Sequence, residues 1–310
     1  MLSPEISVVV ATHNRANLLP LTIDSLIKQT FTNIEIIIVD DASTDETPRV
    51  IGGLIQSETR VRALRSDVNI GPGAARNLGI SNARGEYIAI MDDDDVSLPN
   101  RLEIQLKAFE DDPQLGLVCS MVEYVNYDKE IVGLSPEQPN GKPFPDNPHD
   151  IFTRLYLEGS ILINPTIMAK RHIWEKFNYP NFPWDAEDRF LFMQMAAKGV
   201  RMKFIKQPLV RMLQDPKHES LTRISYQKRI PAKREILRMT RVWLKNEGIH
   251  QFDRYHCLAI SNQFLRESAH YKRNPRALIL IVRAFLSAPK NDEVKNRMLS
   301  YIKAFRWLSD

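Results

Sequence analysis

The sequence has 310 residues, of which 43% are hydrophobic and 26% are charged, and its formal net charge is +4. This composition is that of an ordinary globular protein with a sizeable core, and we expect no nucleic acid among its partners. The two cysteines, Cys119 and Cys257, lie far apart, which excludes a zinc cluster built on thiolates and indicates a reducing compartment. The longest apolar stretch, 277–286, is far shorter than the roughly 20 residues that span a bilayer. Because no basic and apolar leader precedes the first predicted strand, we expect a cytoplasmic location.

Predicted strands and helices alternate over the first hundred residues. Apolar runs predict strands at 6–12, 34–41, 61–64 and 86–92, and the first two are typical of strands buried on both faces of a parallel sheet. Helices are predicted between them, over 18–29, over 43–56 and from Gly71 onward. This order predicts an α/β fold with an open, mainly parallel sheet flanked by helices.

Polar side chains follow three of these strands. Thr12, Asp41 and the run Asp92 to Asp95 all fall at the carboxyl ends, where open α/β sheets bind ligands. Four neighbouring carboxylates repel one another, so a cation is the simplest explanation of what offsets the cost. Oxygen ligands suit Mg2+ or Mn2+. The alternative is a solvated acidic turn.

Beyond Pro99 the predicted elements are less regular. They are a helix at 100–111, a strand at 116–125, a long polar loop at 128–150, a strand at 159–170, a short helix at 171–177, and strands at 202–205 and 209–212. A helix-compatible run also follows Glu187 and Asp188. Carboxylates are favoured at the start of a helix, so capping is an alternative to a chemical role for these two residues.

The character of the chain changes near residue 224. The remainder is helical by pattern and rich in Arg and Lys, so we place a domain boundary at Thr222, with a catalytic domain over 1–222 and a basic helical region over 223–310. An amphipathic stripe lies at 297–308. Such a stripe packs on its own domain, on another subunit of a homo-oligomer, or on an anionic membrane surface at the inner face of the membrane.

Five segments together resemble the family 2 glycosyltransferases. They occur in the family's order and read ISVVVATHNR, SLIKQTFTNIEIIIVDDASTDET, NIGPGAARNLGI, GEYIAIMDDDD and AEDRF. The resemblance covers about the first two thirds of the chain. It implies an inverting enzyme of the GT-A fold that uses a nucleotide-diphosphate sugar, such as a UDP-sugar, and Mn2+ or Mg2+. The acceptor implied is a hydroxyl of a glycan or lipid-linked molecule, in bacterial surface polysaccharide synthesis.

The resemblance also implies residue roles in donor binding. Asp41 is similar to the carboxylate that accepts a hydrogen bond from the nucleotide base, as the imide N–H of uracil would offer. Arg76 resembles the residue that faces the nucleotide, with a surface ion pair to Glu86 or Asp92 as the alternative. The other implied nucleotide contacts are Ala11, Thr12, Arg15, Asp92 and Asp93.

Metal and catalytic roles follow from the same resemblance. Asp94 is the first choice for the metal ligand in the DxD motif, with Asp92 and Asp95 as supports, and His218 lies where relatives carry a further polar contact to the metal or diphosphate. Asp188 matches the general base that deprotonates the acceptor, with Glu187 as the alternative. Trp184 is interpreted either as a stacking partner for a sugar ring or as a core anchor.

Three other interpretations fit parts of the sequence. A haloacid-dehalogenase-type phosphatase shares the D-x-D-x-V pattern at Asp92, but its nucleophile lies near the start of the domain and it needs later paired acids. A sugar nucleotidyltransferase needs a glycine-rich loop after the first strand, and Thr12 to Arg15 contains no glycine. A non-catalytic binding module for nucleotide or glycan is the third.

Overall fold

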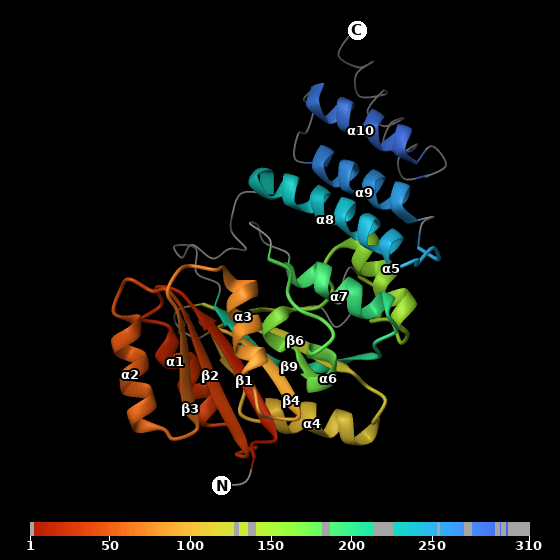
Figure 1. Ribbon diagram of the computed structural model, residues 1–310. Helices are drawn as coiled ribbons and strands as arrows, with labels where there is room; N and C mark the ends of the chain where they lie inside the picture. Colours follow the sequence, from red (N-terminus) through yellow and green to blue (C-terminus); the bar gives the residue numbers. More distant parts are fainter. Residues whose placement is uncertain are drawn as a thin grey trace. The chain divides into compact units, whose positions relative to one another are not determined.

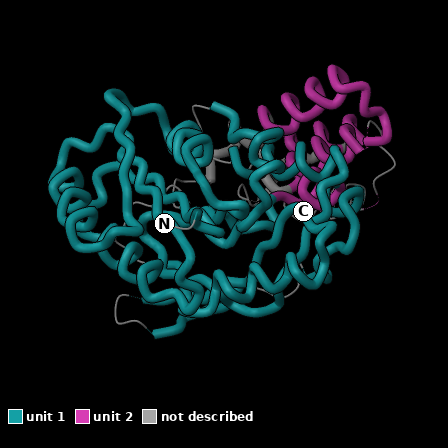
Figure 2. Tube along the Cα trace, turned by 60° about the horizontal axis from the view of Figure 1, so that its bottom comes forward, with its two compact units in different colours: residues 1–152, 160–183, 187–218 teal, residues 153–159, 184–186, 219–310 magenta. Residues whose placement is uncertain are grey.

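The computed structural model describes residues 3–126, 130–135, 141–181, 187–213, 226–252, 255–269 and 275–288, together with Asp292 and Asn296. Two compact units can be distinguished (Figure 2). The first comprises residues 1–152, 160–183 and 187–218, and the second comprises 153–159, 184–186 and 219–310. The predicted boundary at Thr222 lies outside the described residues, so it stays a prediction.

The first unit is built on a nine-stranded mixed sheet (Figure 1). Its parallel part has the order β3 (Val61–Ser66), β2 (Ile34–Asp41), β1 (Ile6–Thr12) and β4 (Tyr87–Asp92). The sheet continues with β8 (Met168–Lys170), β6 (Leu117–Val125), β9 (Met202–Leu213) and β5 (Asp95–Ser97), while β7 (Ile131–Leu134) pairs with β6. The predicted parallel arrangement of the first four strands is therefore confirmed.

Helices cover both faces of the parallel strands because successive side chains of a buried strand point to opposite faces. Val8 and Val10 belong to a core cluster with residues of α1 (Leu19–Ile27) and α4 (Arg101–Asp111). Val9 points the other way, toward α3 (Pro72–Ser81): a Cβ on Gly79 of that helix would lie 2.4 Å from Val9 Cγ1. The helix α2 (Thr47–Ser57) packs beside β2 and β3.

Three sequence predictions beyond residue 126 need correction. The region 128–150 is not a single loop, since it contains β7 and the start of α5 (Pro148–Glu158). Within 159–170 only Met168–Lys170 is a strand, preceded by the 3-10 turn η2 (Asn164–Thr166). The two strands at 202–205 and 209–212 are one strand, β9, whose pairing with β6 shifts register near Met121. The short strand β5 was not predicted, because its carboxylate and serine resemble a turn. Helices α6 (Arg171–Trp174) and α7 (Glu187–Ala197) complete the unit.

The second unit contains α8 (Tyr226–Asn246), α9 (His256–Ala269) and α10 (Pro275–Ser287), and α9 packs against both other helices. The helical character predicted for this region is confirmed. The amphipathic stripe at 297–308 lies outside the described residues. Among the helices that the structure does describe, none is both long and apolar enough to cross a membrane.

Candidate active site

Strand register brings the predicted polar residues to one edge of the sheet. Ala11 on β1 pairs with Asp92 at the end of β4, and Thr12 pairs with Asp40 on β2. Asp41 is the next residue of β2 and is buried. The carboxyl ends of three parallel strands therefore carry these groups side by side, where open α/β sheets hold their ligands.

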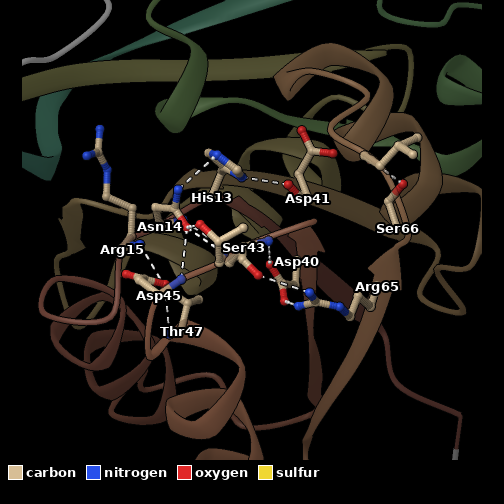
Figure 3. A network of polar contacts seen from close by, with 12 residues as sticks. His13, Asn14, Arg15, Asp40, Asp41, Ser43, Asp45, Thr47, Arg65 and Ser66 are labelled. Atoms are coloured by element: carbon tan, nitrogen blue, oxygen red, sulfur yellow. Dashed lines mark hydrogen bonds and ion pairs between the residues drawn. The ribbon is translucent and has the colours of Figure 1, made fainter.

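The loop after β1 is locked to the loop after β2 (Figure 3). The Nδ1 atom of His13 lies 2.6 Å from the main-chain oxygen of Asp41, and the side chain of Asn14 accepts hydrogen bonds from the main-chain N–H groups of Thr44 and Asp45. Asn14 has a φ of 54°, a left-handed conformation that asparagine tolerates better than most residues. These hydrogen bonds join the two loops into one structural unit at this edge of the sheet.

Asp41 also fixes the segment that leads into α3. Its Oδ1 accepts the N–H of Ile70 at 2.7 Å and its Oδ2 accepts the N–H of Gly71 at 2.9 Å. Each carboxylate oxygen can accept a further hydrogen bond. Its neighbour Asp40 is engaged differently, because it forms an ion pair with Arg65 and accepts the N–H of Ser43.

The carboxylates of the acidic run after β4 are partly buried and act on one another. Asp93 lies 3.9 Å from the guanidinium of Arg15, and its side chain is 14% exposed. Burial and the charge of Asp94 raise the pKa of Asp93 to about 7, and Arg15 offsets part of this. Burial and the charges of Asp92, Asp93 and Asp94 raise the pKa of Asp95 well above its usual range. A cation bound near these carboxyls would favour their charged forms and lower their pKa values.

The residues present fit a hard divalent cation. Asp95 Oδ2 is buried and has no hydrogen-bond partner among the described residues, and oxygen-only ligands are those that Mg2+ and Mn2+ prefer. Within the described part of the chain, no three His, Cys, Asp or Glu side chains are grouped so that they could hold a metal ion by themselves.

Arg76 of α3 connects this run to α7. Its Nη2 donates to Asp92 Oδ1 and its Nη1 donates to Glu187 Oε1, both at 2.8 Å. Burial would lower the pKa of Arg76, but the two carboxylates outweigh it and raise that pKa. The guanidinium is therefore permanently charged, and it joins residues from three separate elements.

Asp188 lies beside this bridge, in the first turn of α7. Its Oδ1 accepts the N–H of Arg189 at 2.6 Å. Asp188 as a whole is partly exposed, but protein atoms surround its carboxyl group. This burial, together with the charge of Glu187, raises the pKa of Asp188 to about 7. The charges of Arg76 and Asp92 also act on this carboxyl, so it lies within electrostatic reach of the end of β4.

The structure thus groups most of the predicted site residues. Asp92, Arg76, Glu187 and Asp188 form one cluster, and Arg15 meets Asp93 beside it. The predicted residues His218 and Trp184 lie outside the described residues. Sequence reasoning missed Tyr179 and Asn164, which contact Arg76 and Asp92 of the cluster, and Arg65, which pairs with Asp40. His13 and Asn14 of the segment ISVVVATHNR, and Asn77 of NIGPGAARNLGI, were given no individual role.

Comparison with known sequences decides the family. The sequence profile described as "Glycosyl transferase family 2" matches residues 7–178. The chain belongs to this family. An uncharacterized glycosyltransferase of Methanocaldococcus jannaschii is 29% identical over 227 residues, which are 73% of this chain and 76% of that protein. The glycosyltransferase GlyG of Streptococcus pneumoniae is 38% identical over 131 residues, which are 41% of this chain and 42% of that protein.

Two solved structures of other proteins share the fold. The structure of TarS 1–349 from S. aureus in complex with UDP-GlcNAc covers 94% of this chain and 82% of its own, with a TM-score of 0.62 and 18% identity. The mannosyltransferase PcManGT from Pyrobaculum calidifontis, in complex with GDP-Man and Mn2+, covers 98% and 86%, with a TM-score of 0.56 and 21% identity. The family 2 glycosyltransferase described here therefore has the GT-A fold, with a helical C-terminal part. The phosphatase and non-catalytic interpretations give way to a glycosyltransferase.

Proposed function

We propose that this glycosyltransferase moves a sugar, with inversion, from a nucleotide-diphosphate sugar to a hydroxyl group of a glycan or lipid-linked acceptor. The Arg76 bridge is the observation that carries the proposal. It holds Asp92, which ends β4, together with the first turn of α7, which carries Asp188. At the β4 end of the bridge, the carboxylates that follow Met91 are proposed to bind the donor's diphosphate. At the α7 end, the carboxyl of Asp188 is proposed to take a proton.

Asp188 is the proposed general base. An inverting transfer needs a group that removes the proton of the acceptor hydroxyl as that oxygen attacks the sugar. A pKa near the working pH is the best compromise between being deprotonated and being basic, and the pKa of Asp188 is raised to about 7. Glu187 suits this role less well, because its Oε1 already accepts a hydrogen bond from Arg76.

Asp41 is proposed to recognise the base of the nucleotide. A carboxylate only accepts hydrogen bonds, so it favours a base that presents an N–H, as uracil does. A UDP-sugar is therefore the first donor to test. TarS was solved with UDP-GlcNAc and PcManGT with GDP-Man, which makes GDP-mannose the second donor to test. Ala11, Thr12 and Arg15 complete the proposed nucleotide contacts.

A divalent cation is proposed to complete the donor site, held by Asp94 with Asp92 and Asp95 as supports. When bound, Mn2+ or Mg2+ would stabilise the charge that grows on the diphosphate as its bond to the sugar breaks. His218 is proposed as a further ligand and lies outside the described residues. We place the reaction in bacterial surface polysaccharide synthesis.

Calorimetry with UDP tests the donor site directly. We expect UDP to bind in Mn2+ or Mg2+ and to bind no longer after a chelator is added. Equal affinity with and without chelator would show that the carboxylates serve another purpose. A parallel screen of UDP-GlcNAc and GDP-mannose, read by thermal shift and by slow donor hydrolysis, identifies the donor.

The basic region 223–310 is proposed to contact the anionic membrane that holds a lipid-linked acceptor. On α10 the side chains of Ile279, Val282 and Leu286 are 53%, 36% and 74% exposed, and the exposed Arg283 lies among them. An apolar stripe with basic neighbours favours such a surface. We expect Leu286→Glu to weaken co-sedimentation with phosphatidylglycerol vesicles, while Leu21→Glu, at an exposed position of the first unit, leaves it unchanged. Vesicle binding equal to that of the wild type in the first variant would contradict this location.

A further inference from the structure

A buried tyrosine completes the surroundings of the Arg76 bridge. Tyr179 lies in the segment between α6 and α7 and is 2% exposed. Its ring stacks on Trp174, with centroids 5.7 Å apart, and its centroid lies 5.4 Å from Cζ of Arg76. A guanidinium at this distance from an aromatic ring is attracted to it, most strongly where water is excluded.

Hydrogen bonds fix the tyrosine at both ends. Its hydroxyl donates to Asn164 Oδ1 at 2.7 Å. Its main-chain N–H donates to Asn77 Oδ1 at 2.9 Å, and its main-chain oxygen accepts from Asn77 Nδ2 at 2.8 Å. These three hydrogen bonds hold both the main chain and the ring of Tyr179 in place.

The contacts close into a ring of four side chains. Asn164, which holds the tyrosine hydroxyl, also points its Nδ2 at Asp92 Oδ1, 3.5 Å away. Asp92 accepts from Arg76, and Arg76 meets the face of Tyr179. Within the described part of the chain the buried Nε atom of Arg76 has no hydrogen-bond partner, so its two carboxylates and this ring face determine how the guanidinium sits.

We propose that Tyr179 is a positioning residue for sugar transfer. Its ring packs against Arg76, and its hydroxyl holds Asn164 beside Asp92. Together these contacts keep Arg76 in the orientation that joins Asp92 to Glu187, and so place Asp188 relative to the donor-binding acids. The inference rests on the proposed function, in which Asp188 is the base. Burial raises the pKa of Tyr179 well above its usual range, so its hydroxyl stays protonated and serves as a hydrogen-bond donor to Asn164.

Tyr179→Phe is the variant that tests the role, because it removes only the hydroxyl. An interaction that matters for the transition state lowers kcat and kcat/KM together and leaves KM unchanged. With the nucleotide sugar selected in the screen as the probe, we expect kcat for donor hydrolysis to fall about tenfold, with the donor KM within about twofold of the wild-type value.

Asn164→Ala and the double variant make the test specific. If the two side chains act as one unit, the double variant should lose no more activity than Tyr179→Phe alone. Tyr87→Phe is the matched control, since Tyr87 packs on Phe109 and removing its hydroxyl should leave kcat unchanged. A kcat equal to wild type in Tyr179→Phe, or fully additive losses in the double variant, would overturn the positioning role.

Asp188→Asn in the same assay separates this inference from the proposed function. If Asp188→Asn retains wild-type turnover, the assignment of the base is wrong and the positioning role falls with it. If Asp188→Asn is silent while Tyr179→Phe turns over normally, the base stands and only the positioning role is refuted.

Discussion

Arg76 and Glu187 are 111 positions apart in the sequence, yet Nη1 of the arginine lies 2.8 Å from Oε1 of the glutamate. The same guanidinium holds Asp92, so the bridge is the direct link between the end of β4 and the start of α7. It also separates the roles of two adjacent carboxylates. Glu187 is held by a cation, whereas Asp188 has a raised pKa and is suited to accept a proton.

Asp188→Asn should nearly silence transfer. The amide has almost the shape of the carboxyl but cannot take a proton, and general-base catalysis typically contributes about 10² to 10⁴ in rate. We therefore expect kcat to fall by about that factor while UDP affinity, measured by calorimetry, stays unchanged. Glu187→Gln keeps an oxygen that can accept from Arg76 and should lose much less. The reverse order of the two losses would move the base to Glu187.

The rate should depend on pH with an acidic limb near neutrality. Burial and Glu187 raise the pKa of Asp188 to about 7, and a base acts only when deprotonated. Below this pH the rate should fall about tenfold per pH unit, and above it the rate should level off. A pH profile of kcat for donor hydrolysis between about pH 5 and 9 checks this. A flat profile across that range would contradict a base with this pKa.

Arg76→Met should destabilise the fold as well as reduce activity. Met fills much of the volume but leaves Asp92 and Glu187 without their cation, and breaking a buried pair on one side typically costs about 3 kcal/mol or more. The partial exposure of Asp92, 27%, reduces this cost. Urea unfolding of Arg76→Met and of the wild type measures the loss in the free energy of unfolding. Arg49→Met, which breaks an exposed pair with Glu46, is the control and should cause no measurable change.

The parallel half of the fold could be predicted from sequence because its strands are continuous apolar runs that end in polar residues. The runs at Ile6–Thr12 and Ile34–Asp41 coincide with β1 and β2. The mixed half could not be predicted as well. The strand β5 has only three residues, Asp95–Ser97, and is recognised by its pairing with β9. The strand β9 has 12 residues, but its pairing with β6 shifts register, and its sequence pattern therefore looks like two shorter strands. Local pattern carries no information on such pairings.

The candidate site likewise contains residues that the sequence predicts and residues that it does not. The acids after β4 and at the start of α7 stand in recognisable motifs, so the sequence alone predicts that they belong to the site. Tyr179 and Asn164 stand in segments without a motif, and their importance comes from a contact with Arg76 or Asp92 that only the fold creates. For Arg76 the sequence left two roles open, contact with the nucleotide or an ion pair with Glu86 or Asp92, and the structure shows the pair with Asp92 and adds one with Glu187 that the sequence did not indicate.

Gly79→Ala should be costly because α3 lies directly on the sheet. A Cβ there would lie 2.4 Å from Val9 Cγ1 and 3.0 Å from Val39 Cγ2, and both valines are buried in strands. We expect a loss of about 1 to 3 kcal/mol in the free energy of unfolding, as is typical of overpacked cores. Gly53→Ala in α2 is the matched control. Beyond its chain neighbours and the nearby backbone of its own helix, no described atom lies within 4 Å of the position that its methyl group would take, so the helix should gain about 0.5 to 1 kcal/mol. Equal effects at the two positions would contradict the close contact of α3.

Asp93 makes stability depend jointly on pH and on a divalent cation. Its pKa in the folded state is about 7, above its ordinary value of 3.8, so the folded state binds more protons than the unfolded state between these limits. The stabilising contribution is therefore complete below about pH 4 and is lost as the pH rises through about 7. Mn2+ competes with those protons and should replace the lost contribution. We expect Mn2+ to raise the Tm more at about pH 8 than at about pH 5.5, and Asp93→Asn to reduce that difference. A Tm increase with Mn2+ that is the same at both pH values would show that the cation binds away from the buried carboxylates.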